Sequence, residues 1–405
     1  MAKKILIVDD SALMRRVACD IISLDSRFEV EDMARNGQEA LDLLRKKSYD
    51  AVILDVNMPR MNGLELLREL QKNRIKARVL MFSTQTAKDT RETIEALELG
   101  AVDFIQKPEG VLDTSSEDFK KHFLALLAVV ARAYGEAHIS WHDKPVGLGG
   151  SGISRTPSAA ARPVRTSPSV SAGDRTPSSG ASRSEGGLMS SGGFTYRRAS
   201  NAPVVLRPVQ TVAGDKIVAI ASSTGGPKAL QSVIPYLPGN LNAPVVLVQH
   251  MPAGFTKSLA ERLDTLSKVH VKEAQEGDKL EKGTVYIAAG GKHMKVGKSG
   301  GNYRIYYTDE PTREGVKPCA NYMYESLIDC SFAQVCCVVL TGMGADGTAG
   351  IQNLDARKKI HVIAQNEETC AVYGMPKAVA VSGLVNEVVP LDKVADAIVK
   401  VVGTN

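Results

Sequence analysis

Five polar side chains follow short apolar runs in the first third of the chain: Asp9, Asp10, Asp55, Ser83 and Lys107. If those runs are parallel strands, the five residues meet at one sheet edge, where α/β proteins bind their ligands. Clustered carboxylates repel one another unless a cation lies among them, and hard oxygen ligands suit Mg²⁺. The pattern predicts that the three aspartates bind Mg²⁺. We also expect Asp55 to accept a phosphoryl group that Lys107 and Ser83 contact.

A second set of reactive side chains follows apolar runs in the last half of the chain. Ser222-Ser223-Thr224-Gly225-Gly226-Pro227 follows the run 216–221, His250 follows 244–249, and Asp346 lies in the glycine-rich loop after 335–340. A serine, a histidine and an aspartate at one sheet edge are the inventory of a nucleophile, a general base and an orienting carboxylate. The backbone N–H groups of 342–344 are candidates for an oxyanion hole.

Each of these patterns also has a structural interpretation. Asp9-Asp10 could cap a helix that starts near Ser11, although capping explains neither Lys107 nor Ser83. A lone histidine at a strand end is more often structural, and an aspartate in a glycine-rich loop is more often a turn residue. The 222–227 loop could cradle a phosphate, but it lacks the P-loop lysine and the GxSxG elbow. The joint occurrence of the three groups favours catalysis.

The segments between these residues alternate between strand-like and helix-like patterns. Apolar runs at 5–8, 51–54, 79–82 and 102–105 are separated by apolar residues at helical spacing, and the alternation resumes after about residue 212. Such alternation predicts an α/β fold with two doubly wound domains, at 1–135 and 212–405, whose sheets are mainly parallel. Adjacent strand residues point to opposite sides, so only one of Ser222 and Ser223 can meet His250.

The segment 136–211 has a different composition from the two predicted domains. It is rich in Ser, Gly, Pro and Arg and lacks apolar periodicity, which predicts a long disordered linker. Its arginines could contact acidic partners or nucleic acid, but a plain tether is the simpler interpretation. The formal net charge of +5 lies largely in this segment, so we predict no nucleic-acid partner.

The whole sequence gives no sign of a membrane-inserted or secreted protein. No run approaches ~20 apolar residues, so no membrane insertion is predicted. The first residues lead straight into a predicted strand, which leaves no room for a signal peptide. The six cysteines form no CxxC pair, as in proteins of a reducing compartment. We therefore expect a cytoplasmic location.

The first 133 residues carry a recognisable set of motifs. They are Ile7-Val8-Asp9-Asp10, Leu54-Asp55-Val56-Asn57-Met58-Pro59, Met61-Asn62-Gly63-Leu64 and Ile105-Gln106-Lys107-Pro108. This part of the chain resembles the flavodoxin-like receiver domain of two-component response regulators. The resemblance implies that a partner histidine kinase phosphorylates Asp55, with Mg²⁺ at the site. It also implies that Ser83, Phe104 and Lys107 are the switch residues.

Residues 215–403 carry a second set of motifs. They are Ser223-Thr224-Gly225-Gly226, Gln249-His250-Met251-Pro252, Gly291-Lys292-His293-Met294, the run 340–347, Ala364-Gln365-Asn366 and Tyr373-Gly374-Met375-Pro376. This part resembles the Rossmann-like catalytic domain of the chemotaxis protein-glutamate methylesterases, the CheB family. The resemblance implies that Ser223 is the nucleophile, His250 the base and Asp346 the orienting carboxylate. Thr224 and Met343 then lie at the oxyanion and substrate site, and no cofactor is expected there.

Four other side chains received weaker interpretations. His293 and Tyr373 either line a substrate groove or, more simply, support loop packing. His270 and His361 fall within predicted strands and are expected to be structural.

The two resemblances together imply one function. It is phosphorylation-activated hydrolysis of glutamate γ-methyl esters on the cytoplasmic helices of methylated chemoreceptors, for adaptation in chemotaxis. Some members of the family also deamidate receptor glutamines. A phosphorylation-switched transcription factor is one alternative, but it needs a helix-turn-helix unit after the receiver. A non-catalytic adaptor that competes for kinase phosphate is another.

Overall fold

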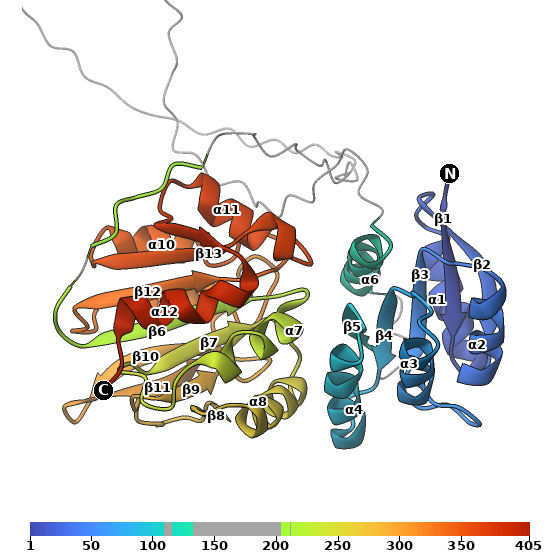
Figure 1. Cartoon of the computed structure of the whole chain (residues 1–405), viewed down its shortest axis with the longest axis horizontal. Helices are drawn as coiled ribbons and strands as arrows, with labels where there is room; N and C mark the ends of the chain where they lie inside the picture. The colour runs from blue at the N-terminus through green and yellow to red at the C-terminus, as the bar shows by residue number, and fades with distance from the viewer. Residues whose placement is uncertain (109–115, 133–203, 211) are drawn as a thin grey trace, which may run out of the picture.

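The structure is a computed structural model that describes residues 1–108, 116–132, 204–210 and 212–405. Almost all of the predicted linker lies outside the described residues, so its limits at 136 and 211 stay a prediction. The described residues form two α/β domains that lie against each other, as Figure 1 shows. No helix in the described ranges is long and apolar enough to cross a membrane.

The smaller domain is built around a parallel sheet with the strand order β2-β1-β3-β4-β5. Its elements, in chain order, are β1 (Lys3–Val8), α1 (Ala12–Ile22), β2 (Phe28–Ala34), α2 (Gly37–Lys46), β3 (Ala51–Asp55), α3 (Gly63–Lys72), β4 (Val79–Ser83), α4 (Ala87–Glu98), β5 (Asp103–Gln106) and α6 (Glu117–Val130).

The pleat of the strands divides the core of this domain into two layers. Leu6 and Val8 of β1 pack on one face of the sheet, in the cluster that contains residues of α2, α3 and α4. Ile5 and Ile7 point to the other face, where they pack with residues of α1 and α6. Because successive side chains of a strand alternate between faces, a continuous apolar run fills both layers. The sheet is thereby buried, and its carboxyl edge is left for polar residues.

The larger domain contains a seven-stranded parallel sheet with the order β14-β13-β12-β6-β7-β9-β8 and a separate antiparallel pair, β10-β11. Its elements are β6 (Lys216–Ser222), α7 (Gly226–Gln231), η1 (Ile234–Tyr236), β7 (Val245–Gln249), α8 (Phe255–Leu266), β8 (His270–Glu273), β9 (Thr284–Ile287), β10 (His293–Ser299), β11 (Asn302–Thr308), α9 (Ala320–Ser326), β12 (Gln334–Val339), α10 (Thr348–Asp355), β13 (Ile360–Gln365), η2 (Glu367–Thr369), α11 (Met375–Val381), β14 (Glu387–Val389), η3 (Leu391–Lys393) and α12 (Val394–Val402). The prediction of two domains with mainly parallel sheets is confirmed.

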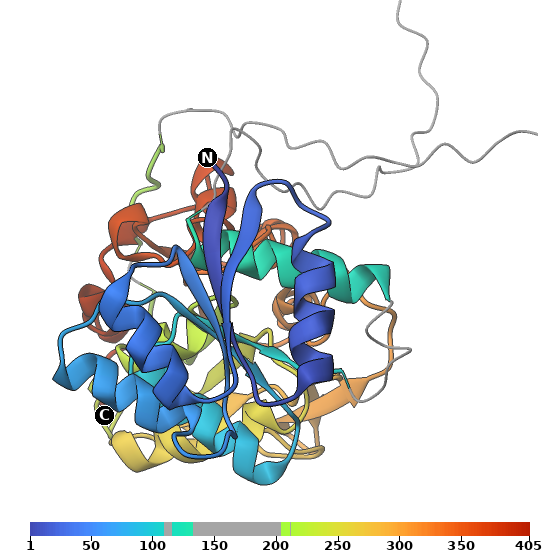
Figure 2. The same cartoon turned by 90° about the vertical axis from the view of Figure 1, so that its right-hand side faces the viewer.

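The two domains meet along α4 and β5 of the smaller one. Helix α4 packs against α7 and α8 of the larger domain, and Figure 2 shows the smaller domain lying in front of the larger one. Phe104 of β5 stacks on Phe255 of α8, with 4.4 Å between the ring centroids and 26° between the planes. Both rings belong to one cluster of packed apolar residues that extends through the two domains. The two domains therefore share a packed apolar interface.

Candidate active site and phosphorylation site

Strand register places Ser223 beside His250 at the centre of the larger sheet. Ser222 pairs with Gln249 as the last residues of β6 and β7, so each next residue leaves the sheet at the same level. On its other side β6 pairs with β12, which leads into the loop that carries Asp346. Three neighbouring parallel strands thus deliver a hydroxyl, an imidazole and a carboxylate to one edge, as ligand sites in such sheets require.

The two adjacent serines have different surroundings. Ser222 is fully buried, and its Oγ donates to Gln249 Oε1 at 2.7 Å. Ser223 is half-buried, and its backbone N–H donates to the Thr341 carbonyl at 3.0 Å. Among the described residues, no hydrogen bond joins the Ser223 hydroxyl to His250. A missing bond here does not argue against the pair, since catalytic hydrogen bonds often tighten only when substrate binds.

Asp346 is buried and saturated with hydrogen-bond donors. Its Oδ2 accepts from His250 Nε2 at 2.8 Å and from the Ala320 N–H at 2.6 Å. Its Oδ1 accepts from the N–H groups of Asn321 and Gly347 at 2.9 and 2.8 Å and from the Cys319 thiol at 3.1 Å. Burial raises the pKa of Asp346, but these donors, with His250 foremost, outweigh it and hold the pKa below the usual value. The carboxylate therefore stays ionised.

The contact with Asp346 also fixes the orientation of the imidazole. His250 is almost buried, with 10% of its side chain exposed, and its Nε2 faces Asp346. A neutral imidazole that donates from Nε2 has its lone pair on Nδ1. Nδ1 is thus the atom that can accept a proton from a neighbouring hydroxyl, which is the task of a general base.

The glycine-rich loop lies directly against the Ser223 side chain. A Cβ atom added at Gly342 would lie 2.7 Å from the Ser223 Cβ, so only glycine fits there. The Gly342 N–H donates to the Val372 carbonyl at 3.1 Å. The Gly342 N–H is therefore already bonded. Of the three predicted oxyanion donors in this loop, the N–H groups of Met343 and Gly344 remain as candidates. Met343 is half-buried, while Thr224 is buried and its carbonyl accepts from the Thr341 hydroxyl.

Gln249 is a supporting residue to which the sequence analysis gave no role. Its Nε2 donates to the Ser223 carbonyl at 2.9 Å and to the His250 carbonyl at 3.2 Å, while its Oε1 accepts from Ser222. One buried amide thus ties the serine loop to the histidine loop. A glutamine at the last position of an otherwise apolar strand is the signal that could have revealed it.

The four remaining predicted residues lie in different settings. His293 is fully buried, and its ring packs edge-on against Tyr322 at 4.7 Å, which fits loop support rather than an open groove. Tyr373 forms a backbone bridge with Gly342 beside the site. His361 and His270 lie in strands, each paired with a carboxylate, Glu387 and Asp264 respectively.

Four of the five residues predicted at the edge of the smaller sheet come together: Asp9, Asp10, Asp55 and Lys107. The Lys107 Nζ lies 2.7 Å from Asp9 Oδ2 and 2.8 Å from Asp55 Oδ1. Ligand oxygens of Asp9, Asp10 and Asp55 all lie within 4.8 Å of one another. Burial raises the pKa of Asp55 to about 6, with Lys107 lowering it and Asp9 raising it. Two buried carboxylates and one exposed carboxylate, all hard oxygen donors with their ligand atoms close together, fit a divalent cation such as Mg²⁺.

The alternative interpretation is that Asp9-Asp10 caps a helix, but the N-cap residue of α1 is the neighbouring Ser11. Ser11 is the N-cap of α1, where its side chain accepts from the Met14 N–H. Asp9 accepts from the Ser11 N–H at 2.8 Å and so braces the cap while its other oxygen faces Lys107. Structural and binding roles therefore coexist in Asp9.

Two of the three predicted switch residues, Ser83 and Phe104, make other contacts in this structure. The Ser83 hydroxyl is buried; it accepts from the Thr93 hydroxyl at 2.7 Å and donates to the Thr84 carbonyl at 3.2 Å. Phe104 is buried against Phe255 of the other domain. Neither group is free to contact a phosphoryl group at Asp55 without breaking its present contacts.

The residue before Phe104 touches the serine loop itself. Asp103 Oδ2 accepts from the Gly225 N–H at 3.3 Å, two residues after Ser223. Burial raises the pKa of Asp103 to about 7, although the Phe104 and Gly225 N–H groups and the Thr224 hydroxyl lower it. Gly225 has a φ of 73°, and a Cβ there would lie 2.5 Å from Ala371, so the loop requires glycine at this contact. The smaller domain thus lies on the candidate active site.

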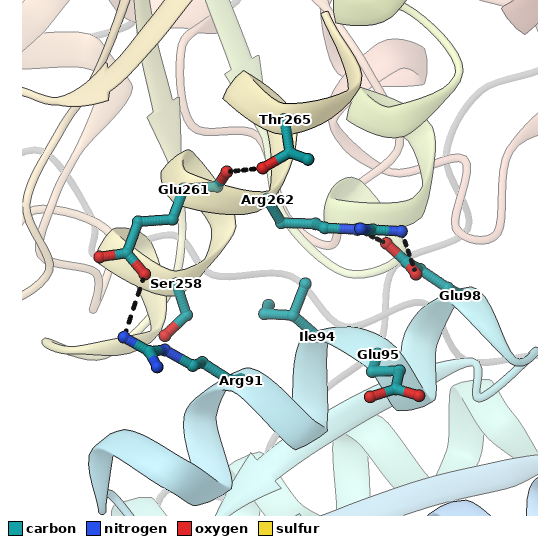
Figure 3. A pocket seen from close by; sticks show the side chains of 8 residues that line it. All are labelled: Arg91, Ile94, Glu95, Glu98, Ser258, Glu261, Arg262 and Thr265. Carbon is teal, nitrogen blue, oxygen red and sulfur yellow. Dashed lines mark hydrogen bonds and ion pairs between the residues drawn. The ribbon is translucent and has the colours of Figure 1, made fainter.

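Charged side chains surround the apolar part of the interface. The guanidinium group of Arg262 in α8 donates to both carboxylate oxygens of Glu98 in α4. Nε donates to Oε1, and Nη2 donates to Oε2 at 2.9 Å. Arg91 of α4 lies 3.6 Å from Glu261 of α8. Figure 3 shows Arg91 of α4 reaching Glu261 and Arg262 of α8 reaching Glu98, so the two pairs have opposite polarity. All four residues line a pocket of about 400 Å³ between the two helices. Opposite charges on facing helices favour this one docking arrangement.

Comparisons with known proteins agree with the two-domain arrangement. Residues 218–398 match the CheB methylesterase family, and residues 5–114 match the response regulator receiver domain. Proteins named protein-glutamate methylesterase/protein-glutamine glutaminase are 39% identical in Geobacillus kaustophilus, over 99% of each chain, and 37% identical in Bacillus subtilis, over 98% of this chain and 97% of that one. The crystal structure of the Thermotoga maritima CheB methylesterase catalytic domain is 40% identical, covers 46% of this chain and 99% of its own, and aligns with a TM-score of 0.45. The chain belongs to the CheB family of protein-glutamate methylesterases/protein-glutamine glutaminases.

Proposed function

We propose that this chain hydrolyses glutamate γ-methyl esters in a protein substrate and that phosphorylation of Asp55 activates it. The observation that carries the proposal is the bond between His250 and Asp346 at the edge where Ser223 leaves the sheet. The names of the relatives supply the ester and the amide as substrate classes. Glutamine deamidation is the second reaction of the same site, because both substrates are carboxyl derivatives of one side chain.

The chemistry follows from the placement of the three side chains. Ser223 Oγ attacks the ester carbonyl while His250 Nδ1 takes its proton, and Asp346 stabilises the imidazolium. The N–H groups of Met343 and Gly344 donate to the developing oxyanion, with Thr224 beside it. The imidazolium then protonates the leaving methoxide, and methanol departs from an acyl-serine. Water, deprotonated by the same imidazole, attacks the acyl group; the bond to Ser223 Oγ breaks, the imidazolium returns its proton to that oxygen, and glutamate is released.

The docked smaller domain supplies the control. Asp103 and Phe104 cover the Ser223 loop and α8, so a protein substrate reaches the site only when the domains separate. Asp9, Asp10 and Asp55 would hold Mg²⁺, which supplies positive charge for transfer of the phosphoryl group. A phosphoryl group on Asp55 draws the Ser83 hydroxyl and Lys107 from their present partners, and Phe104 leaves Phe255 as it follows. The matched receiver domain supports a histidine kinase as phosphodonor partner.

The substrate and the location complete the proposal. Chemoreceptor cytoplasmic helices that carry methylated glutamates are the substrate class we assign, which places the reaction in the cytoplasm. A DNA-binding output is set aside, because the described part of the second domain is built around a parallel sheet that ends in the Ser223, His250 and Asp346 group. The non-catalytic adaptor remains the alternative for experiment to exclude.

Methanol release from methylated receptor membranes is the direct test. The full chain should release methanol slowly, and a small-molecule phosphodonor with Mg²⁺ should accelerate the release. Asp55→Ala should keep the slow rate and lose the acceleration, because the acceptor carboxylate is gone while the esterase residues are intact. Equal acceleration of the variant would contradict the switch. A chain that takes up phosphate but releases no methanol would establish the adaptor.

A further inference from the structure

The Cys319 thiol is a side-chain donor to Asp346, and the mechanism proposed above gives it no role. Cys319 is fully buried and is the N-cap residue of α9, directly before Ala320. Its Sγ lies 3.1 Å from Asp346 Oδ1, the carboxylate oxygen that faces away from His250. The other donors to that oxygen are backbone N–H groups, of Asn321 and Gly347. Cys319 is therefore the one side chain that binds Oδ1 in the described structure.

The direction of this hydrogen bond follows from charge. Burial and the neighbouring charge of Asp346 raise the pKa of the Cys319 thiol, so the thiol keeps its proton at neutral pH. An ionised carboxylate can only accept, so the thiol donates. A thiol is a weaker donor than a hydroxyl and withdraws less charge from the carboxylate. The strength of this one donor thus affects how much negative charge Oδ2 presents to His250.

We propose that Cys319 is a positioning residue for ester hydrolysis: its thiol holds Asp346 so that Oδ2 meets His250, and its donor strength sets the basicity of that imidazole. The proposal rests on the proposed function of His250 and Asp346. A stronger donor at position 319 leaves less charge on Asp346 and stabilises the imidazolium less. Removal of the donor has the opposite effect.

Other charges near the pair are common to every variant. Arg313, which is ion-paired with Glu325, acts electrostatically on both Cys319 and Asp346. The Tyr324 hydroxyl of α9 is buried and donates to backbone carbonyls. His122 of α6 acts on His250 from the smaller domain. Since none of these is altered, a change in the titration of His250 reports on position 319.

The test compares Cys319→Ala and Cys319→Ser in the full chain, with Cys330→Ala as the control. Cys330 is buried in the same domain, and its thiol donates to the Ser326 carbonyl rather than to the site. The acidic limb of kcat/KM for methanol release should move up by roughly half a pH unit in Cys319→Ala, about a threefold loss of activity below the limb. Cys319→Ser should move it down, and Cys330→Ala should leave it unchanged.

A second readout separates this proposal from the proposed function. The pKa of His250 can be measured by NMR titration in a Ser223→Ala background, where no catalysis is needed. The His250 pKa should be highest with alanine at position 319, intermediate with cysteine and lowest with serine. Identical His250 titrations in all three would overturn the positioning role, as would a serine variant that shifts with the alanine variant. If the His250 pKa values follow this order but the chain with Ser223 intact releases no methanol, the proposed function is rejected, while the role of Cys319 in positioning Asp346 against His250 stands. A loss confined to thermal stability would show a structural role only.

Discussion

At the scale of single residues, the main uncertainty in the sequence was the choice between two adjacent serines. The structure gives them opposite surroundings: Ser222 is buried on Gln249, whereas Ser223 is half-buried beside the glycine-rich loop. Side-chain alternation along a strand implies that one serine faces inward. It does not say which one, because that depends on where the strand ends relative to its neighbours.

Substitution of each serine by alanine should distinguish them. Ser223→Ala should lower ester hydrolysis by roughly 10³-fold or more, since the nucleophile is lost. Ser222→Ala should retain measurable activity but cost about 1–3 kcal/mol of unfolding free energy, because Gln249 Oε1 loses its buried partner. Rates of methanol release and urea unfolding curves give both values. An inactive, fully stable Ser222→Ala variant would reverse the assignment.

At the scale of elements, the sequence predicted the buried strands of the smaller domain well and several other strands poorly. Strands β1, β3, β4 and β5 were expected within a residue or two of their ends. The edge strand β2 (Phe28–Ala34) was missed because only its two terminal residues are buried, so its polar residues hide the period-two pattern. The pair β10-β11 was also missed, although Gly300-Gly301, both with positive φ, is a turn signal that hairpins favour.

The contact between β5 and the serine loop predicts a pH-dependent interface. Docking buries Asp103 among neutral groups, the amides of Phe104 and Gly225 and the Thr224 hydroxyl, and burial raises its pKa to about 7. In the separated domain the carboxyl meets water, so its pKa returns toward the usual value near 4. The docked state thus holds the proton more tightly. Docking should be strongest at low pH and weaken between about pH 4 and 7, by at most about tenfold per unit.

Small-angle scattering of the unphosphorylated chain across this pH range measures the effect. The radius of gyration should grow as the pH rises toward 7, since more molecules separate. Asp103→Asn, which carries no titratable proton and still accepts from the Gly225 N–H, should show a flatter dependence. A dependence as steep in the variant as in the parent chain would show that another group is responsible.

At the scale of the whole molecule, local sequence patterns do not predict how the two domains meet. The Ser223, His250 and Asp346 group and the aspartate cluster could each be proposed from strand ends, because sheet topology alone gathers such residues. The pairing of α4 with α8 depends on Arg91 and Glu98 in one helix and Glu261 and Arg262 in the other, and no local pattern relates two helices so far apart in the chain. From sequence alone, a charged residue on the polar face of a helix is expected to face solvent, because its partner on the other domain is not known.

Charge reversal at this interface should release the site without phosphorylation. Glu98→Arg places two cations together across α4 and α8, so methanol release by the unphosphorylated chain should rise roughly threefold or more. Arg262→Glu should have the same effect. The double variant restores an opposite-charge pair and should return activity toward the parent value. Additive rises in the double variant would show that the pair does not hold the domains together.

In the proposed switch, the stack of Phe104 on Phe255 gives the molecule a two-way thermodynamic linkage. The aromatic ring cannot both follow the Ser83 hydroxyl toward a phosphorylated Asp55 and remain against α8. Phosphorylation therefore favours separation, and by reciprocity anything that binds the separated form must favour phosphorylation by the same factor. A receptor segment that occupies the Ser223 loop would thus raise the equilibrium extent of Asp55 phosphorylation, and the substrate would act as its own enzyme's activator.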